Sequence, residues 1–299
     1  MGKGRKSVHQ RSDMAKKQKS RKTVLIALGG VAVVVFAATV FLKMPGPSAT
    51  SAIEPFTKAP IAHRGYFDNN SEAPENSLPA FQRAIDHGYC IELDTQITAD
   101  GTVVVLHDKS LLRSSGVDRN VDEMTDAELA ECRLFGTDEH VPTFQEVLDL
   151  IDGQVPLLVE IKGEAGDDVA AISEKTALAL DNYKGVYVVQ SFNPFALQWF
   201  KNNRPNVARG LLCKDFIADG AGQNPVVRAL LSAEMLNVIV RPNFISYELD
   251  SSRQLTFRAT HAMSDIPCFA WTLKSQEELE RAKEQGFVGF IFDGFEAHL

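Results

Sequence analysis

A stretch with the pattern of a β-hairpin, "IELDTQITADGTVVVLHD" (91–108), carries acidic and imidazole side chains among its apolar residues. Glu92 and Asp94 are two residues apart, so their carboxylates share one face of the first strand. Because only the turn sequence "TADGT" separates the two strands, we expect them to be antiparallel, which returns His107 toward these carboxylates. Two carboxylates that face a protein interior are costly unless a cation lies between them. The hairpin therefore predicts a site that binds a cation.

A second apolar strand, "LLVEIK" (157–162), repeats this pattern, with Glu160 and Lys162 on one face at its C-terminal end. In a parallel barrel, the C-terminal ends of the strands carry the active site. Glu92, Asp94 and Glu160 together form an oxygen-ligand set suited to one divalent metal ion, Mg²⁺ or Ca²⁺. Solvated strand ends or simple ion pairs are the alternative for any single pair, but the recurrence of the pattern favours a metal site.

Two histidines end apolar strands, His63 in "PIAHRG" and His107 in "VVVLHD", and a charged residue follows each. A single histidine at such a position is more often structural than catalytic. Two of them, beside carboxylates and beside Arg64 and Lys162, predict a general acid and a general base on either side of a phosphate group. Asp108 is predicted to orient the loop that carries His107.

Short apolar strands alternate with helix-like segments from about residue 60 to the end of the chain. Without a Gly-rich dinucleotide loop, this alternation favours an α/β fold of the (β/α)8 TIM-barrel type over a doubly wound sheet. The antiparallel hairpin accounts for one strand more than eight, so we predict a distorted barrel. Helices are predicted from the N-cap Ser77 to about His87, over 167–182, up to about Asn203 and over 275–286. The predicted strands are 60–65, 89–94, 102–108, 156–162, 185–192, 207–212, 237–240, 266–272 and 288–294.

The net charge of −8 over 299 residues hides an asymmetry. Residues 1–22 hold nine of the 31 Lys and Arg residues and one acid, which leaves 22 basic and 38 acidic residues, a net of −16, in the remainder. A body that acidic is a poor partner for nucleic acid, and the basic arm, which could touch it, is better explained by the segment that follows, so we predict no nucleic-acid partner. The four cysteines, Cys90, Cys132, Cys213 and Cys268, lack zinc-ligand spacing. Disulfides are possible outside the cell, but Cys90 and Cys268 fit buried strand positions better.

The N-terminal region has the pattern of a membrane anchor. Residues 24–42 carry no charge and are long enough as a helix to cross a hydrocarbon layer of about 30 Å. We predict a basic cytoplasmic tail (1–22), a single transmembrane helix (23–42), a linker rich in Pro, Ser and Ala (43–59) and an extracytoplasmic folded domain (60–299). The alternative is a signal peptide cleaved near "SATSA" (48–52), which would make the protein secreted.

Ten short motifs occur in a fixed order, and together they resemble the glycerophosphodiester phosphodiesterase family over residues 60–299. The resemblance implies a catalytic TIM barrel that hydrolyses glycerophosphodiesters to glycerol 3-phosphate and an alcohol with a divalent metal ion. The motifs are "HRG" (63–65), "PENS" (74–77), "AFQRAIDHG" (80–88), "IELDTQITADG" (91–101), "VVVLHD" (103–108), "LLRSSG" (111–116), "VPTFQEVLDL" (141–150), "VEIK" (159–162), "VVQSF" (188–192) and "WT" (271–272).

The same resemblance implies roles for individual residues. His63 and His107 match the acid–base pair, so that one removes the proton of an attacking glycerol hydroxyl and the other protonates the leaving alcohol, before water opens a cyclic phosphate. Glu75 and Asn76 would support the site or only shape the turn before Ser77. The remaining matches are Glu92, Asp94 and Glu160 as metal ligands, Arg64 and Lys162 as phosphate contacts, and Trp271 as an aromatic lining of the pocket.

The sequence departs from the family pattern in its last third, at "LKS" (273–275) and at "IFDGFEA" (291–297), and we expect both changes at the pocket rim, where they bear on substrate choice. A lysophospholipase D is the first alternative, because an anchor and a short segment after His107 would leave an open mouth near the bilayer. Extracellular polyglycerol phosphate is another substrate candidate. An inactive barrel that binds headgroups or a protein partner would be expected to lack a histidine or a carboxylate, and none is missing.

Overall fold

The computed structural model describes residues 29–30, 34, 37–38, 41, 43–47, 49–164, 166–219, 224–225, 232, 237–254, 257–258, 261–262 and 265–299. The predicted tail (1–22) and most of the predicted anchor (23–42) lie outside these residues. Within the described part of the chain, no helix combines the length and the apolar character that crossing a membrane requires.

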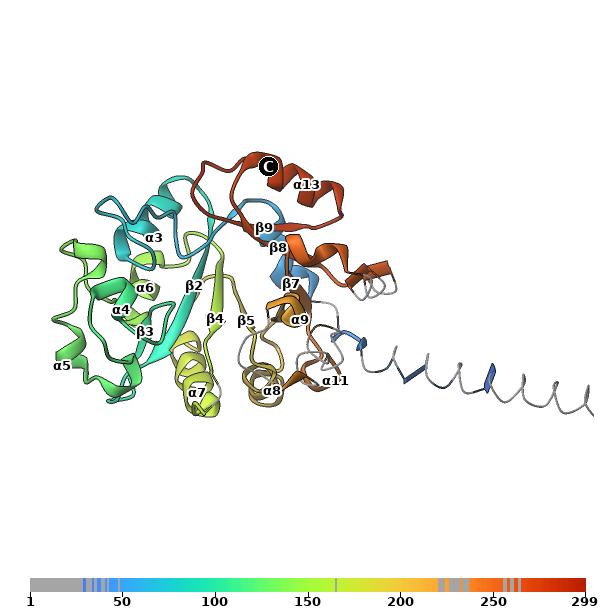
Figure 1. Cartoon of the computed structure of the whole chain (residues 1–299), viewed down its shortest axis with the longest axis horizontal. Helices are drawn as coiled ribbons and strands as arrows, with labels where there is room; N and C mark the ends of the chain where they lie inside the picture. Colours follow the sequence, from blue (N-terminus) through green and yellow to red (C-terminus); the bar gives the residue numbers. More distant parts are fainter. Residues whose placement is uncertain are drawn as a thin grey trace, which may run out of the picture.

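Eight parallel strands form a closed barrel, as predicted (Figure 1). The ring closes at β1, where Ile61 pairs with Cys90 on one side and with Ile291 on the other. The large apolar clusters lie between the strands and the outer helices and inside the N-terminal end of the barrel. The strands of the ring are β1 (Ile61–Ala62), β2 (Cys90–Ile97), β4 (Leu157–Ile161), β5 (Tyr187–Ser191), β6 (Arg209–Cys213), β7 (Phe244–Glu248), β8 (Cys268–Leu273) and β9 (Gly289–Phe292).

Helices cover the outside of the barrel (Figure 1). The first of them begins where the sequence predicts, because Ser77 Oγ accepts a hydrogen bond from Ala80 N at 3.3 Å. It ends before Gly88, whose φ of +68° suits glycine. The longer helices are α3 (Leu78–Asp86), α6 (Phe144–Ile151), α7 (Val169–Leu180), α8 (Pro194–Asn203) and α13 (Gln276–Glu284). The shorter α-helices and 3₁₀ turns are α4 (Leu112–Ser115), η2 (Val121–Glu123), α5 (Asp126–Leu129), η3 (Leu134–Gly136), α9 (Phe216–Asp219), α11 (Asn237–Val240) and η4 (Asp250–Arg253).

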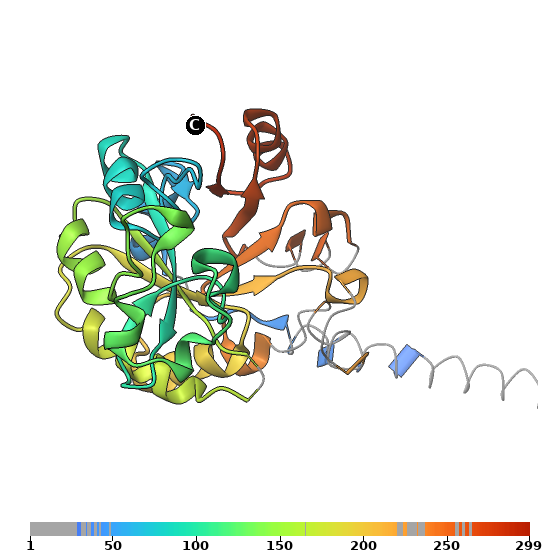
Figure 2. The same cartoon turned by 60° about the vertical axis from the view of Figure 1, so that its left-hand side comes forward.

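The predicted hairpin is present at the C-terminal end of β2. The strand β3 (Val103–Val105) pairs antiparallel with Thr95–Ile97, where β2 extends beyond its neighbours in the ring. The segment that follows β3, green in Figure 2, packs around its own apolar cluster, which includes Leu111 and Val121. The hairpin brings the residue before His107 back to the barrel, since Leu106 N donates to Asp94 O at 3.0 Å.

One predicted strand is wrong. Residues 237–240 form the short helix α11, and the strand lies further along, as β7. A short run such as "NVIV", with three apolar residues, does not distinguish a strand from a buried helical turn. Here the run ends at Val240, two residues before Pro242, and Asn243 N then donates to Arg209 O at 2.8 Å as the chain enters the sheet. The tertiary contact therefore overrides the β-branched composition of the run.

The N-terminal end of the barrel is closed by residues that we predicted to be part of an irregular linker. Residues 50–57 form α2 (Thr50–Ile53) and the 3₁₀ turn η1 (Glu54–Thr57), which together carry only two buried apolar residues, too few to show a helical period. Those two, Ile53 and Phe56, are buried among the first residues of the strands. Their partners in this cluster, called here the barrel floor, include Ile61, Cys90, Leu158, Val188, Phe244, Phe269 and Ile291.

The chain reaches the barrel floor along the segment that precedes β7. Asn243 Nδ2 donates to Pro47 O at 2.7 Å, and Arg241 Nη1 donates to Met44 O at 3.2 Å. Gly46 N also donates to Pro242 O at 2.8 Å. The N-terminal segment therefore joins the barrel at the end opposite to the C-terminal ends of the strands.

Candidate active site

Three carboxylates meet inside the C-terminal end of the barrel. Glu92 and Asp94 come from β2 and Glu160 comes from β4, and each residue is at most 6% exposed. One oxygen atom from each carboxylate lies within 4.8 Å of the other two. The strand alternation that places them on one inner face is the one predicted from the sequence.

Two cationic side chains lie against this group. Lys162 Nζ is 2.9 Å from Asp94 Oδ1 and 2.8 Å from Glu160 Oε1, and Arg64 Nε is 3.5 Å from Asp94 Oδ2. Burial opposes the ionisation of Asp94, but the nearby positive charges, led by Lys162, hold its pKa well below the usual value. Burial and the charge of Asp94 raise the pKa of Glu92 well above its usual value. Burial likewise raises the pKa of Glu160 to about 7, although Lys162 opposes this shift.

These residues fit a divalent metal ion. Two cations do not balance three buried carboxylates, and the raised pKa values of Glu92 and Glu160 show that a further positive charge would be favourable there. Carboxylate oxygens are the ligands that Mg²⁺ and Ca²⁺ prefer. The donor set alone does not distinguish the two ions, since both accept carboxylates.

His63 follows β1 and is held by an acid from the last strand. Its Nδ1 lies 3.1 Å from Asp293 Oδ2, just after β9. A carboxylate acceptor favours the tautomer with the proton on Nδ1, which leaves Nε2 available for proton transfer. Burial, together with the charge of Arg64, lowers the pKa of His63 to about 4. Asp293 also accepts a hydrogen bond from Lys274 Nζ at 2.5 Å.

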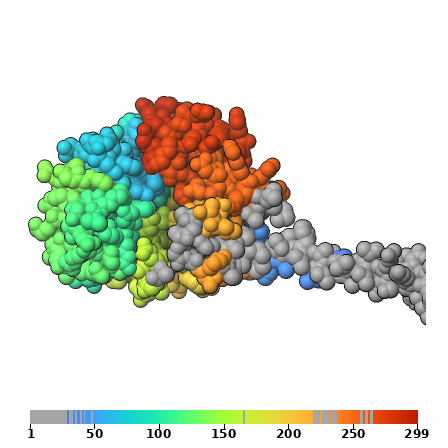
Figure 3. Space-filling model, in the orientation of Figure 1, coloured from blue at the N-terminus to red at the C-terminus, as the bar shows by residue number. Residues whose placement is uncertain are grey.

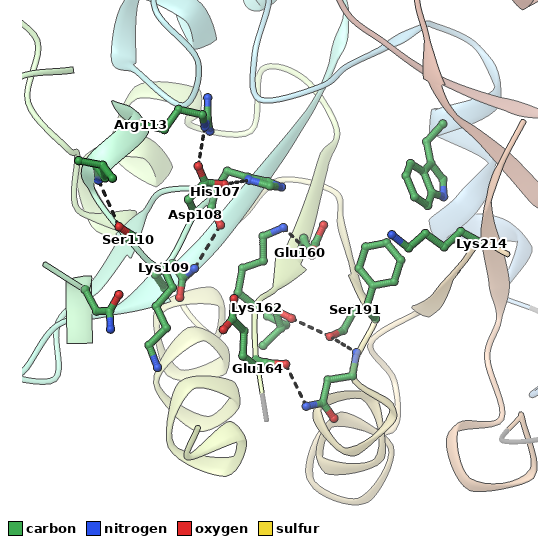
Figure 4. Close-up of a pocket in the computed structure, with 18 residues that line it drawn as sticks. His107, Asp108, Lys109, Ser110, Arg113, Glu160, Lys162, Glu164, Ser191 and Lys214 are labelled. Atoms are coloured by element: carbon green, nitrogen blue, oxygen red, sulfur yellow. Dashed lines mark hydrogen bonds and ion pairs between the residues drawn. The ribbon is translucent and has the colours of Figure 1, made fainter. Parts of the chain in front are cut away.

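His107 is held in the same way by its own neighbour. Its Nδ1 lies 2.6 Å from Asp108 Oδ1, and Arg113 Nε donates to the other oxygen of Asp108 at 2.5 Å. Arg113 Nη2 in turn donates to Glu75 Oε1 at 2.7 Å, and Arg64 Nη1 donates to the same oxygen at 2.9 Å. Asp108 and Glu75 therefore belong to one chain of charged hydrogen bonds that joins the hairpin to the loop before α3, and Figure 4 shows its part from His107 through Asp108 to Arg113.

Two amides complete the support of the carboxylates. Asn76 Nδ2 donates to Asp94 Oδ2 at 3.0 Å, from a left-handed backbone conformation (φ +57°) that asparagine tolerates. Gln190 Nε2 donates to Glu92 Oε1 at 3.2 Å, and Gln190 Oε1 accepts from Ser246 Oγ at 2.7 Å. The Gln190 amide therefore presents its Nε2 to Glu92 and its Oε1 to the Ser246 hydroxyl, which can act as a donor.

The structure gathers seven of the predicted site residues around one small cavity of about 100 Å³, while Asp94 and Asn76 lie behind it, bonded to each other and to its lining. The residues on the cavity wall are His63, Arg64, Glu92, His107, Glu160, Lys162 and Trp271.

Three residues of the site were missed by sequence reasoning: Asp293, Gln190 and Arg113. The first two carried a usable signal, since each is a polar residue in or just after an apolar strand of the barrel. Arg113 lies in a short helix and reaches Glu75 across 38 residues, and nothing local indicates that contact. Asp293 also corrects our expectation for "IFDGFEA", because this departure lies against His63 and not only at the rim.

Two larger cavities open from the site. The His107 cavity, about 1050 Å³, runs between the hairpin and Lys214 (Figure 4), and the His63 cavity, about 520 Å³, extends toward α13. In Figure 3 the segment that follows β3 (green) lies at the left of the molecule and the C-terminal segment (red) lies at the top. Trp271 lines both cavities, and its Nε1 has no hydrogen-bond partner among the described residues. The indole N–H is thus a buried donor at the wall between the two cavities.

Comparison with known proteins identifies the family of this chain. Residues 63–297 match the model of the glycerophosphoryl diester phosphodiesterase family. A glycerophosphodiester phosphodiesterase of Caldanaerobacter subterraneus is 30% identical over 244 residues, which cover 78% of this chain and 93% of that protein. A lysophospholipase D of Rattus norvegicus is 33% identical over 164 residues, which cover 50% of each chain.

Solved structures agree with the fold. A phosphodiesterase of Oleispira antarctica, in complex with the product sn-glycerol-3-phosphate, superimposes with a TM-score of 0.65 at 22% identity and covers 79% of this chain and 92% of its own. A glycerophosphodiester phosphodiesterase of Thermotoga maritima gives a TM-score of 0.59 at 23% identity, with 78% and 94% covered. At these identities the likeness shows the barrel fold.

Proposed function

The chain belongs to the glycerophosphoryl diester phosphodiesterase family and is a phosphoric diester hydrolase, and we propose that it cleaves water-soluble glycerophosphodiesters to glycerol 3-phosphate and an alcohol. The observation that carries this proposal is that two histidines, two cationic side chains and two carboxylates line one cavity at the C-terminal ends of the strands. The two carboxylates are those of Glu92 and Glu160. The product bound by the Oleispira antarctica protein supports glycerol 3-phosphate as the product here.

Glu92, Asp94 and Glu160 are proposed to hold one divalent ion, Mg²⁺ or Ca²⁺. When bound, the ion would supply positive charge that polarises the phosphoryl oxygens. Arg64 and Lys162 line the same cavity and would bind the remaining phosphate charge, since a diester phosphate needs cationic donors on more than one side. Trp271 also lines this cavity, and its ring would contact the substrate.

His63 and His107 are proposed to move the protons. Each histidine has its Nδ1 directed to a carboxylate, so each presents Nε2 to the cavity. One imidazole takes the proton from the attacking glycerol hydroxyl as its oxygen bonds to phosphorus, and the other gives a proton to the departing alkoxide. In the second step a water molecule attacks the cyclic phosphate, and the two imidazoles exchange roles.

The path of the N-terminal segment bears on the lysophospholipase D alternative. We expected an anchored chain to hold the mouth of the active site near the bilayer. Residues 43–47 instead join the barrel at the end opposite to the active site, beside Arg241 and Asn243. An anchor at 23–42 would therefore attach behind the barrel floor. This geometry supports soluble diesters over lysolipids of the same membrane, because the mouth would then face the aqueous phase.

An activity assay of the full chain tests the proposal. Glycerophosphocholine, lysophosphatidylcholine and polyglycerol phosphate would be supplied in turn, with Mg²⁺ or Ca²⁺, and the phosphate-containing products would be measured. We expect turnover of the soluble diester, and its loss by at least about a thousandfold with EDTA, with His63→Ala or with His107→Ala.

His298→Ala, an exposed histidine far along the chain, is the matched control and should keep full activity. Full activity of the wild-type chain in EDTA, together with full activity of His63→Ala and His107→Ala, would reject the proposed chemistry. Faster turnover of lysophosphatidylcholine or of the polymer than of the soluble diester would reject the proposed substrate.

A further inference from the structure

A phosphodiester has two arms on its phosphorus, and two cavities open from this site. Trp271 lines both the His63 cavity and the His107 cavity, so it stands between them. Each arm of a bound diester can therefore occupy a cavity of its own. The inference that follows rests on the proposed function and concerns which arm enters which cavity.

The His107 cavity is lined by more bases than acids. Its acids are Asp108, Glu160 and Glu164, and its bases are Lys109, Arg113, Lys162 and Lys214 (Figure 4). The neutral amides Gln96, Asn120 and Asn193 also line it. Amides can both donate to and accept from hydroxyl groups, so this cavity suits the uncharged glycerol arm.

The His63 cavity has the opposite balance. Its bases are Arg64, Lys274 and Arg281, and its acids are Glu75, Glu248, Asp250, Glu278 and Asp293. Arg281 pairs with Asp250 at 3.2 Å and with Glu278 at 3.5 Å, and Lys274 pairs with Asp293 at 2.5 Å. Glu75 is held by Arg64 and Arg113. Four of the five acids thus have a basic partner within the protein, although Asp250 and Glu278 share Arg281.

Glu248 is the acid that is left. Its carboxylate accepts a hydrogen bond from Ser251 Oγ, and no basic side chain of the described residues lies within ion-pair distance of it. It is the last residue of β7, and its Cα pairs with that of Trp271 on β8. Paired residues on parallel strands point to the same side of the sheet, about 4.8 Å apart, so Glu248 and the indole are neighbours at the mouth.

We propose that the His63 cavity binds the leaving alcohol when it carries a cationic amino group, and that Glu248 selects that charge. Phe67 and Trp271 line the cavity with Glu248. Aromatic faces attract ammonium groups, and a carboxylate without a basic partner supplies the opposite charge. An amino alcohol such as choline or ethanolamine has its nitrogen two carbons beyond the ester oxygen, and a neutral polyol gains nothing from Glu248.

The test compares two substrates on the full chain, glycerophosphocholine with a cationic headgroup and glycerophosphoglycerol with a neutral one. Glu248→Gln keeps an oxygen to accept from Ser251 and removes the charge. We expect the KM for glycerophosphocholine to rise roughly tenfold, an effect of the size that cation–π and partly exposed ion pairs give, while the KM for glycerophosphoglycerol changes less than twofold.

Glu164→Gln is the matched control, because Glu164 lines the His107 cavity and also lacks a basic partner among the described residues. It should leave the ratio of the two KM values unchanged. An equal effect of Glu248→Gln on both substrates would overturn the proposal. A loss of preference in Glu164→Gln alone would place the cation in the other cavity.

Direct binding separates this inference from the proposed function. Titration calorimetry with millimolar choline should show saturable binding to the wild-type chain and at least about fivefold weaker binding to Glu248→Gln. If the wild-type chain hydrolyses neither diester, the proposed function fails, and the choline titration still decides the cavity. Equal binding of choline to the two proteins would reject the role of Glu248.

Discussion

The two ends of the barrel are built from the same strands and have opposite chemistry. The inner face of β2 carries Cys90 at the floor and then Glu92 and Asp94 toward the mouth, and β4 carries Leu158 and then Glu160. At the floor these positions pack with Ile53 and Phe56 from the N-terminal segment. At the mouth the equivalent positions are buried carboxylates. Two residues along each of these strands therefore separate an apolar core from an ionic centre.

The contrast indicates that stability and activity have different sources in this molecule. Apolar burial at the floor stabilises the folded chain by about 25 cal/mol for each Å² removed from water. Buried charges at the mouth lose their hydration, and an ion network often recovers little more than this cost. We therefore expect mutations at the mouth to change catalysis far more than stability, and mutations at the floor to do the reverse.

The largest effect is expected from Glu92→Gln at the mouth. Glycerophosphodiester hydrolysis should fall about a thousandfold, which corresponds to about 4 kcal/mol, because one of three proposed metal ligands is neutralised. The free energy of unfolding in EDTA should stay within about 1 kcal/mol of the wild-type value, since burial and Asp94 already disfavour a charge on Glu92. Product release and urea unfolding measure the two quantities, and a collapse of stability would contradict the contrast.

The floor should respond to Phe56→Ala in the opposite way. Phe56 is fully buried, and its removal leaves a cavity, so we expect the free energy of unfolding to fall by about 3–5 kcal/mol. The kcat per folded molecule should stay within about twofold. Urea denaturation gives the first value and active-site-normalised kinetics the second. Phe195→Ala, at a side chain that is 62% exposed, is the control and should leave both nearly unchanged.

A smaller effect is expected from Asp293→Asn, which tests how the mouth is organised. The asparagine can no longer hold His63 Nδ1 by charge, so we expect kcat to fall about 10–100-fold with little change in KM. A merely structural role would lower the unfolding temperature and leave kcat per folded molecule unchanged. Steady-state kinetics together with a thermal melt therefore distinguish the two roles. Asp86→Asn, at an exposed position at the end of α3, is the neutral control.

Local sequence patterns predicted most of the fold. The period of two in "IELD" and "LLVEIK" places Glu92, Asp94 and Glu160 on one inner face, and the short "TADGT" turn makes β3 antiparallel. Both rules act over a few residues, so one chain is enough to apply them. The same locality explains the error at 237–240, where only the entry of Asn243 into the sheet decides between helix and strand.

What the sequence by itself determined, then, is which residues the strands carry to the mouth: the carboxylates, His63, His107 and their cationic neighbours. Only the tertiary structure decided how they are held. His63 meets Asp293 across 230 residues because the barrel closes β9 onto β1, and Glu75 reaches Asp108 only through Arg113. Residues 50–57 join the barrel floor for the same reason, because the N-terminal end of a closed barrel has to be filled with apolar side chains. Such contacts depend on closure of the whole ring, which no local period encodes.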